Sequence, residues 1–187
     1  MSEPAVIAVF GSSATEPGSP TWDDAERVGR ELAEAGFAVV TGGYGGSMEA
    51  VSKGAADFGG QVVGVISSAL FPGRTGANPH VGSLVEAASL HDRIERLTTM
   101  ACGVIALPGS IGTAAELLIV WNLNNITRSH GRGRIPTVAV GERWGRLHEL
   151  MIETGAVPDD IEVVATADEA LRWLLGQPEV SPHLATR

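Results

Sequence analysis

The sequence predicts a single α/β domain: a three-layer, Rossmann-like, doubly wound parallel sheet with helices on both faces. Short apolar runs alternate with amphipathic stretches along the 187 residues, and unbroken apolar runs are typical of parallel strands buried on both faces. The gaps between these runs are too long for hairpins, so helical crossovers are expected. Because no internal repeat or linker is found, residues 1–176 are expected to form the domain and residues 177–187 a flexible tail.

The elements follow from the two periodicities and from the turn residues between them. The apolar runs predict strands at residues 5–10, 37–41, 62–66, 84–87, 104–107, 136–140 and 162–165. Helical spacing predicts helices at residues 21–35, 48–57, 90–102, 113–125, 144–154 and 168–175. Thr21 is expected to cap the first helix, and Thr113 with Glu116 has the spacing of a capping box. Residues 67–83 lack periodicity and predict a long loop of the kind that often binds ligands, with Arg74, Asn78 and His80 as hydrogen-bonding groups.

Three loops rich in glycine and small residues are each expected to follow a strand. The carboxyl ends of parallel strands share one edge of the sheet, and ligands bind there at the point where the strand order reverses. If the major strands are ordered 3-2-1-4-5, the three loops meet in one cleft, and the third presents the N-terminus of a helix to an anion. Glycine turns before helices are also ordinary structural devices. The candidate phosphate- or nucleotide-binding residues are Gly11, Ser12, Gly42, Gly43, Tyr44, Gly45, Gly46, Ser47, Met48, Pro108, Gly109, Ser110, Ile111, Gly112 and Thr113.

Several function classes are excluded by composition and by missing motifs. A formal net charge of −9 argues against nucleic-acid binding, and a single cysteine permits no internal disulfide. No apolar stretch is long enough for a membrane span and no signal peptide is seen, so a cytoplasmic location is expected. Metal-ligand spacing, the dinucleotide fingerprint, the Walker loop and the hydrolase elbow are missing, so no metal or cofactor is expected. The only lysine, Lys53, falls inside a predicted helix, which argues against pyridoxal chemistry.

The kind of site that these exclusions leave is a phosphate-binding cradle with one carboxylate and one or two arginines. Glu116 stands one turn into the helix after the third loop, and Arg93 lies on the preceding helix outside its apolar stripe. From the residues alone, Glu116 is equally consistent with a helix cap. For Arg93, the residues alone favour a solvated arginine on the helix face that pairs with Glu86 or Glu95. His91 is expected at the surface.

A basic cluster stands out in this acidic chain. It lies in a loop expected at residues 126–135 and contains Arg128, His130, Arg132 and Arg134. A solvated loop is the usual meaning of such a cluster, and an ordered contact with a phosphate or a partner subunit is the alternative. The apolar residues Trp121 and Leu123 on the preceding helix are consistent with either a subunit interface or the core.

Three motifs, in order, resemble those of the LOG family, named after the "Lonely guy" cytokinin-activating enzymes. Residues 108–116 are similar to its P-G-G-x-G-T-x-x-E motif, Asp92-Arg93 resembles its E-R-K element, and residues 41–50 resemble its glycine loop. The resemblance covers residues 6–140. It implies a nucleotide-binding domain over residues 1–176 and a homodimer that hydrolyses a cytokinin-type or AMP-like nucleoside 5′-monophosphate to free base and ribose 5-phosphate. Arg93 and Glu116 would be the catalytic pair.

The sequence departs from the family pattern at three positions. Ser110 replaces a glycine, Ile94 replaces the lysine of E-R-K, and Glu49 stands where cytokinin-activating members usually have glycine. Residues 42–50 are more similar to a side branch that includes molybdenum-cofactor carrier proteins. These departures motivate a second hypothesis: a non-catalytic carrier or sensor of a phosphorylated ligand, such as molybdenum cofactor or a nucleotide.

Overall fold

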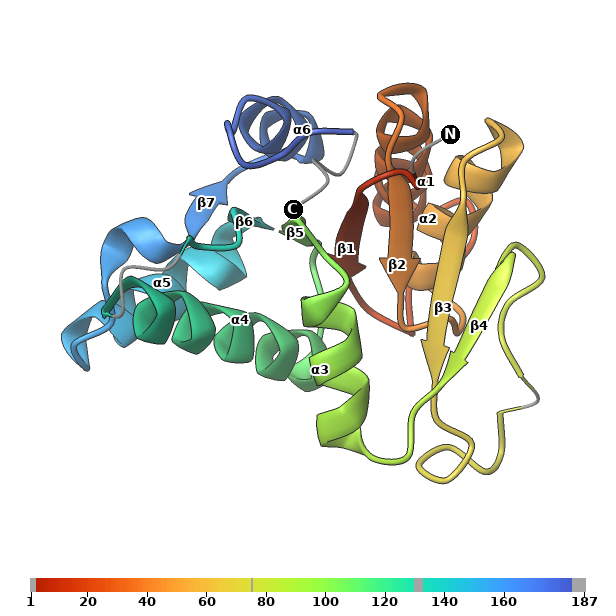
Figure 1. The fold of residues 1–187 in the computed structure, drawn as a ribbon, viewed down its shortest axis with the longest axis horizontal. Coiled ribbons are helices and arrows are strands. Elements are labelled where there is room, and N and C mark those ends of the chain that lie inside the picture. Colours follow the sequence, from red (N-terminus) through yellow and green to blue (C-terminus); the bar gives the residue numbers. More distant parts are fainter. Residues whose placement is uncertain (1–2, 75, 130–132, 183–187) are drawn as a thin grey trace.

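The computed structural model describes residues 3–74, 76–129 and 133–182. Within these ranges, the strands form one parallel seven-stranded sheet in the order β4-β3-β2-β1-β5-β6-β7 (Figure 1). The strands are β1 (Val6–Phe10), β2 (Ala38–Thr41), β3 (Val62–Ile66), β4 (Ser83–Glu86), β5 (Gly103–Ala106), β6 (Thr137–Val140) and β7 (Glu162–Val164). The predicted fold class is confirmed, and so is the order of the major strands, with β4 added beyond β3.

Helices cover both faces of this sheet. They are α1 (Pro20–Glu34), α2 (Ser47–Asp57), α3 (Leu90–Thr99), α4 (Ile111–Ser129), α5 (Glu142–Glu153) and α6 (Ala167–Leu175), with a 3-10 turn, η1, at Pro158–Asp160. One apolar core joins the sheet to α1, α2 and α6, and the other joins it to α3, α4 and α5 (Figure 1). Alternate residues of β1 enter opposite cores, because successive strand side chains point to opposite faces: Ile7 and Val9 enter the first, Ala8 and Phe10 the second.

Helices α1 and α2 touch backbone to backbone. A Cβ atom on Gly29 would lie 2.0 Å from the Val51 carbonyl oxygen, and one on Gly54 would lie 1.9 Å from the Glu26 carbonyl oxygen. Only glycine fits at either position without moving a helix. The pair of glycines therefore fixes the position of α2, whose N-terminus follows the second glycine loop.

The start of α1 differs from the expectation. The N-cap is Ser19 and not Thr21: the Ser19 hydroxyl accepts a hydrogen bond from the Trp22 N–H, and Pro20 occupies the first helical position. Proline is favoured there because its fixed φ suits a helix and its missing N–H would have had no helical partner. Helix α3 also differs from the expectation, because it ends at Thr99 and not at residue 102.

Helix α4 corrects two predictions. It begins at Ile111, two residues before the expected Thr113, so Thr113 lies inside the first turn and the capping box with Glu116 is not formed. It also continues to Ser129, so residues 126–129 are helical and not part of a loop. The backbone carbonyl of Ser110 accepts from the N–H of Ala114 at 3.0 Å, which closes the first turn without the Thr113 side chain.

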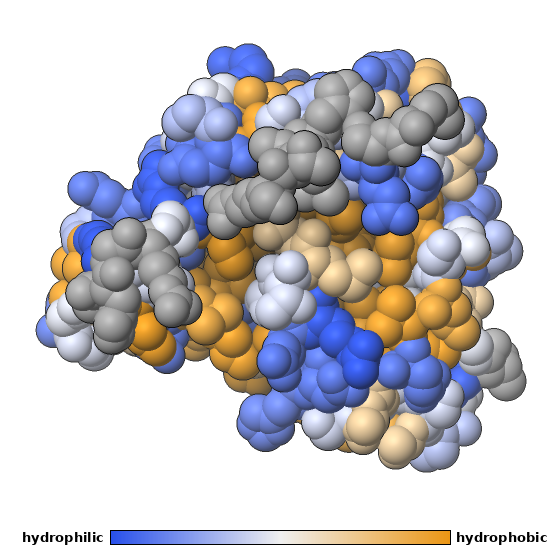
Figure 2. All heavy atoms as spheres, in the orientation of Figure 1, coloured by the Kyte–Doolittle hydropathy of each residue, from blue (hydrophilic) through white to orange (hydrophobic). Residues whose placement is uncertain are grey.

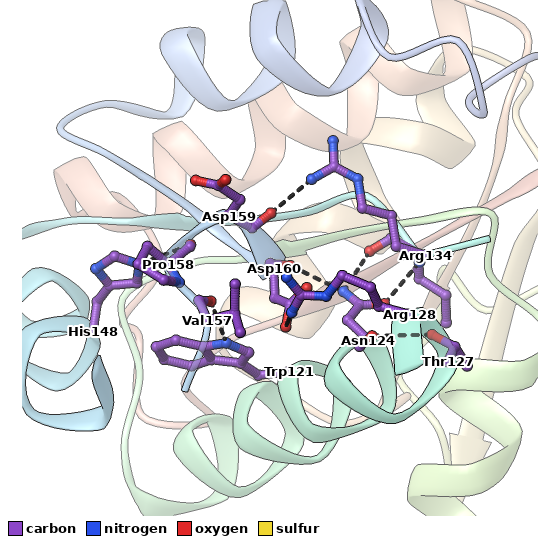
Figure 3. Close-up of polar contacts among 11 residues, drawn as sticks. Trp121, Asn124, Thr127, Arg128, Arg134, His148, Val157, Pro158, Asp159 and Asp160 are labelled. Carbon is purple, nitrogen blue, oxygen red and sulfur yellow. Dashed lines mark hydrogen bonds and ion pairs between the residues drawn. The ribbon is translucent and has the colours of Figure 1, made fainter. Parts of the chain in front are cut away.

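The basic cluster makes contacts within the chain, which neither hypothesis for it proposed (Figure 3). Arg128 forms an ion pair with the buried carboxylate of Asp160, and Arg134 Nη1 donates to the Asp159 carbonyl at 2.7 Å. These contacts hold η1 against the C-terminal half of α4. Residues 130–132, which include His130 and Arg132, lie outside the described part of the chain.

The C-terminal half of α4 is also tied to the core. Trp121 is buried, and its indole N–H donates to the Val157 carbonyl at 3.2 Å (Figure 3). Trp121 is therefore a core residue of this chain, while Leu123 is half-buried. In the part of the expected tail that is described, Val180 is buried and the Pro182 carbonyl accepts from the Ala5 N–H at 3.1 Å. No helix of the described ranges is both long and apolar enough to cross a membrane.

Candidate functional site

Arg93 connects three elements at the carboxyl edge of the sheet. Its Nε donates to the Val65 carbonyl at 2.8 Å and its Nη2 to the Gly42 carbonyl at 3.1 Å. Its Nη1 lies 3.5 Å from Oε1 of Glu116 on α4. The residue is only 6% exposed. Arg93 is therefore not a solvated arginine paired with Glu86 or Glu95, as one alternative held.

Glu116 is almost as deeply placed as its partner, with 12% of its side chain exposed. Burial raises the pKa of the Glu116 carboxyl to about 7, because desolvation disfavours the charged form, and nearby Arg93 opposes this shift. Burial also lowers the pKa of the Arg93 guanidinium, with Glu116 opposing. An arginine stays charged at neutral pH even so. The pair thus combines a fixed positive charge with a carboxyl that titrates near neutral pH.

The glycine loops are shaped by these side chains. A Cβ atom on Gly42 would lie 2.0 Å from Nη2 of Arg93 and 2.6 Å from Sδ of Met48. Gly46 has a φ of +70°, and a Cβ there would lie 2.3 Å from the Ser12 carbonyl oxygen. That carbonyl accepts from the Ser47 N–H at 2.8 Å. The loops after β1 and β2 are consequently packed against each other, as the strand order predicted.

A cavity of about 180 Å³ lies in front of the Arg93–Glu116 pair. Eight of the predicted site residues line it: Gly11, Gly42, Met48, Arg93, Ser110, Gly112, Thr113 and Glu116. A cavity of about 620 Å³ lies beyond Ser110 and is lined by Ser12, Pro108, Gly109 and Ser110, among others. A third, of about 330 Å³, is lined in part by Tyr44 and Gly45. The remaining predicted residues, which line none of these three cavities, are Gly43, Gly46, Ser47 and Ile111.

Thr113 presents a hydroxyl without a partner among the described residues. Its Oγ1 is buried and forms no hydrogen bond, although buried polar atoms are nearly always paired. The oxygen lies under the loop, where a Cβ atom on Gly109 would come within 2.2 Å of it. The first turn of α4 adds backbone N–H groups that have no partner inside the helix. An anion seated in the first cavity could satisfy both kinds of donor.

The β3–β4 loop, described at residues 67–74 and 76–82, forms the outer wall of the site. Phe71 and Arg74 line the cavity, and the Arg74 guanidinium lies over the rings of Tyr44 (4.5 Å) and Phe71 (4.6 Å). The Tyr44 hydroxyl accepts from the Ser67 N–H at 2.9 Å, which anchors the loop. The sequence predicted a ligand-binding loop here but missed Phe71, for which a lone aromatic residue in a polar loop was the available signal.

Ser13 lines the same cavity and was also missed. It directly follows the predicted Gly11-Ser12 pair, so its position after the first strand was the available signal. Lys53, in contrast, lies away from the cavity and bonds Glu26 (2.6 Å) and Asp57 (2.9 Å) through its Nζ. Within the described ranges, no group of three or more acidic, histidine or cysteine residues could hold a metal ion.

The chain is similar in sequence to several known proteins. A family model described as "Possible lysine decarboxylase" matches residues 48–174. The cytokinin riboside 5′-monophosphate phosphoribohydrolase LOG of Oryza sativa subsp. japonica is 37% identical over 118 residues, which are 62% of this chain and 48% of that protein. The chain thus matches about half the length of that relative. The corresponding enzyme of Mycobacterium marinum is 32% identical over 145 residues, 77% of this chain and 74% of that protein.

A solved structure extends the likeness in fold. The molybdenum cofactor carrier protein of Chlamydomonas reinhardtii superposes with a TM-score of 0.67 at 21% identity, over 92% of this chain and 99% of that one. At this level of identity the superposition shows a shared fold.

Proposed function

Because this chain belongs to the LOG/lysine-decarboxylase-like family, we propose that it hydrolyses the N-glycosidic bond of a nucleoside 5′-monophosphate. The products would be a free base and ribose 5-phosphate. The observation that carries the proposal is the buried Arg93–Glu116 pair, which lines a cavity together with Gly112 and Thr113 of the first turn of α4.

The first role is to hold the phosphate. The N-terminus of α4 offers N–H groups and the positive end of the helix dipole, and Thr113 adds a buried donor. Fixing the 5′-phosphate there limits where the sugar can lie, which converts binding energy into orientation. The C1′ atom would then lie against Glu116, one turn further along the same helix.

The second role is to stabilise the transition state. Breaking an N-glycosidic bond builds positive charge on the sugar, and a carboxylate beside C1′ stabilises that charge. The stabilisation is large because Glu116 is held in a site with little solvent. Arg93 positions the carboxylate and keeps part of it ionised at neutral pH by opposing the desolvation shift.

The test is a hydrolysis panel with free base measured by chromatography. Purified protein is incubated with AMP, GMP, CMP, UMP, dAMP and isopentenyl-AMP, beside the variants Glu116→Gln and Glu95→Gln. Glu95 is an exposed carboxylate on α3 and serves as the matched control. Base release that is lost in Glu116→Gln and kept in Glu95→Gln is expected. Equal release by wild type and Glu116→Gln would contradict the proposal.

A non-catalytic carrier of a phosphorylated ligand is the second candidate. It is favoured by Ile94, which is buried in place of the family's lysine and so brings no charge to the site. The cavity of about 620 Å³ beside Ser110 also exceeds the one at the catalytic pair. This candidate predicts a ligand retained through purification, seen by mass spectrometry, and no turnover. Multiple turnovers with saturation kinetics would contradict it.

We also propose that the chain forms a homodimer through α4. In Figure 2 hydrophobic surface extends along α4 beside the hydrophilic surface of α3. Ile119 and Ile126, seven residues apart on α4, are 37% and 46% exposed, a spacing that places them on one face. Light scattering should show a dimer for wild type and a monomer for Ile119→Glu. A wild-type monomer at micromolar concentration would contradict this.

A further inference from the structure

Glu49, in the first turn of α2, lines a cavity outside the catalytic pair. This cavity of about 330 Å³ shares Ser13 and Arg74 with the cavity of Arg93 and Glu116. The two cavities are therefore neighbours, and a ligand anchored beside Arg93 and Glu116 could extend into the cavity that Glu49 lines. A cavity of this size falls in the range of small-molecule sites.

The polar groups of the cavity that Glu49 lines differ in the hydrogen-bonding atoms that they leave free for a ligand. The Asn78 amide is used within the chain: Nδ2 donates to the carbonyls of Gly43 (3.2 Å) and Tyr44 (3.1 Å), and Oδ1 accepts from the His80 N–H (3.1 Å). Glu49, in contrast, forms no hydrogen bond or ion pair with any residue in the described ranges. The Glu49 carboxylate therefore keeps its acceptor oxygens for a ligand, beside the Arg74 guanidinium that lies over the Tyr44 ring.

The carboxylate lies beside the glycine loop. A Cβ atom placed on Gly45 would lie 3.6 Å from Oε2 of Glu49, so the side chain lies along the loop that leads to Met48 and the catalytic cavity. An acid in the first turn of a helix also complements the helix dipole, but this effect does not require contact with a cavity. Asp23, in the first turn of α1, is such an acid: it is exposed and lines none of the three cavities.

A carboxylate with two acceptor oxygens selects a ring edge with two adjacent N–H donors. A 2-amino-4-oxo-pyrimidine ring has this edge, and it occurs in guanine and in pterins. The corresponding edge of adenine pairs a donor with a ring-nitrogen lone pair, which a carboxylate repels. We propose that Glu49 selects ligands with a 2-amino-4-oxo ring. The inference rests on the proposed function only in placing the ligand's phosphate at α4, since either hydrolysis or carriage can follow.

The first experiment compares kcat/KM for GMP, IMP and AMP in wild type, Glu49→Gln and Asp23→Asn. IMP keeps the ring N–H and lacks the 2-amino group, so the expected order is GMP, then IMP, then AMP. Loss of a charged hydrogen bond predicts about a 10- to 100-fold fall for GMP in Glu49→Gln, with little change for AMP. Asp23→Asn should match wild type, because it removes an exposed first-turn acid of α1 that lines none of the three cavities.

The second experiment tests whether the 2-amino-4-oxo ring can belong to a pterin and not to a guanine nucleotide. Neopterin monophosphate carries the same ring edge and has no N-glycosidic bond, so its affinity is measured by pterin fluorescence with the same variants. Binding at least tenfold tighter in wild type than in Glu49→Gln, with no nucleotide hydrolysed, would support this inference while the hydrolase proposal fails. Equal kcat/KM values for GMP and AMP in wild type, together with neopterin binding that is either undetectable in wild type or unchanged in folded Glu49→Gln, would overturn it. Circular dichroism confirms that the variant is folded.

Discussion

The raised pKa of Glu116 makes the stability of this protein depend on pH in a predictable direction. The carboxyl has an ordinary pKa of 4.5 when the chain is unfolded and about 7 when it is buried beside Arg93. Between these values the folded state binds more protons than the unfolded state, so the free energy of unfolding falls as pH rises. One pKa unit corresponds to about 1.4 kcal/mol, so the full effect is about 3 kcal/mol.

Replacing Glu116 with glutamine removes the titrating group and keeps its shape. The variant should therefore gain stability relative to wild type as pH rises from 5 to 8, by about 3 kcal/mol in total, with most of the change complete near pH 7. Little screening is expected, because only 12% of the side chain is exposed. Below about pH 4 the two proteins should differ little, since the carboxyl is then mostly neutral in both the folded and the unfolded chain.

Urea denaturation at pH 5, 6, 7 and 8 measures this difference, provided that the m-value stays constant between the two proteins. Glu95→Gln, at an exposed position of α3, is the control and should follow wild type across the range. Parallel stability curves for wild type and Glu116→Gln would refute the reasoning, because they would mean that the carboxyl titrates alike in the folded and unfolded chains.

Three further variants test other parts of the structure. Gly42→Ala should lose about 1–3 kcal/mol of stability, because its methyl group would collide with the buried guanidinium; Gly73→Ala, with open space around it, is the control in thermal melts. Thr113→Val should leave stability within about 1 kcal/mol but weaken ribose 5-phosphate binding about tenfold by calorimetry, since it removes only an unpaired donor. Arg128→Ala should cost about 1–2 kcal/mol in urea and leave base release unchanged, because it strands the buried Asp160 carboxylate far from the cavity.

The strands were predictable because their signal is local. Unbroken apolar runs such as residues 62–66 can bury both faces only inside a parallel sheet, and the loops that follow them reach one edge whatever their details. The strand order then brought Gly11, Gly42 and Gly112 to one cavity. This much of the site depends on the backbone, which the periodicity determines.

What could not be predicted depends on contacts between distant residues. The spacing of Thr113 and Glu116 satisfies a capping box, and only the approach of Arg93, on another helix, shows why Glu116 turns elsewhere. Arg128 was predicted to lie in a loop, because its partner Asp160 is 32 positions away in the sequence and no local pattern indicates it. In both cases a tertiary ion pair decided between two local conformations of similar propensity.

The close contact of α1 and α2 at Gly29 and Gly54 determines which side of the cavity can yield when a ligand enters. Helices that meet carbonyl against Cα cannot slide without breaking backbone contacts, so α1, α2 and the two loops at their N-termini should behave as one rigid wall. The β3–β4 loop also lines the cavity, and its residues Pro72 and Gly73 are exposed. Exchange of ligand and product is therefore expected to proceed past that loop, at a rate that substitutions in the rigid wall leave unchanged.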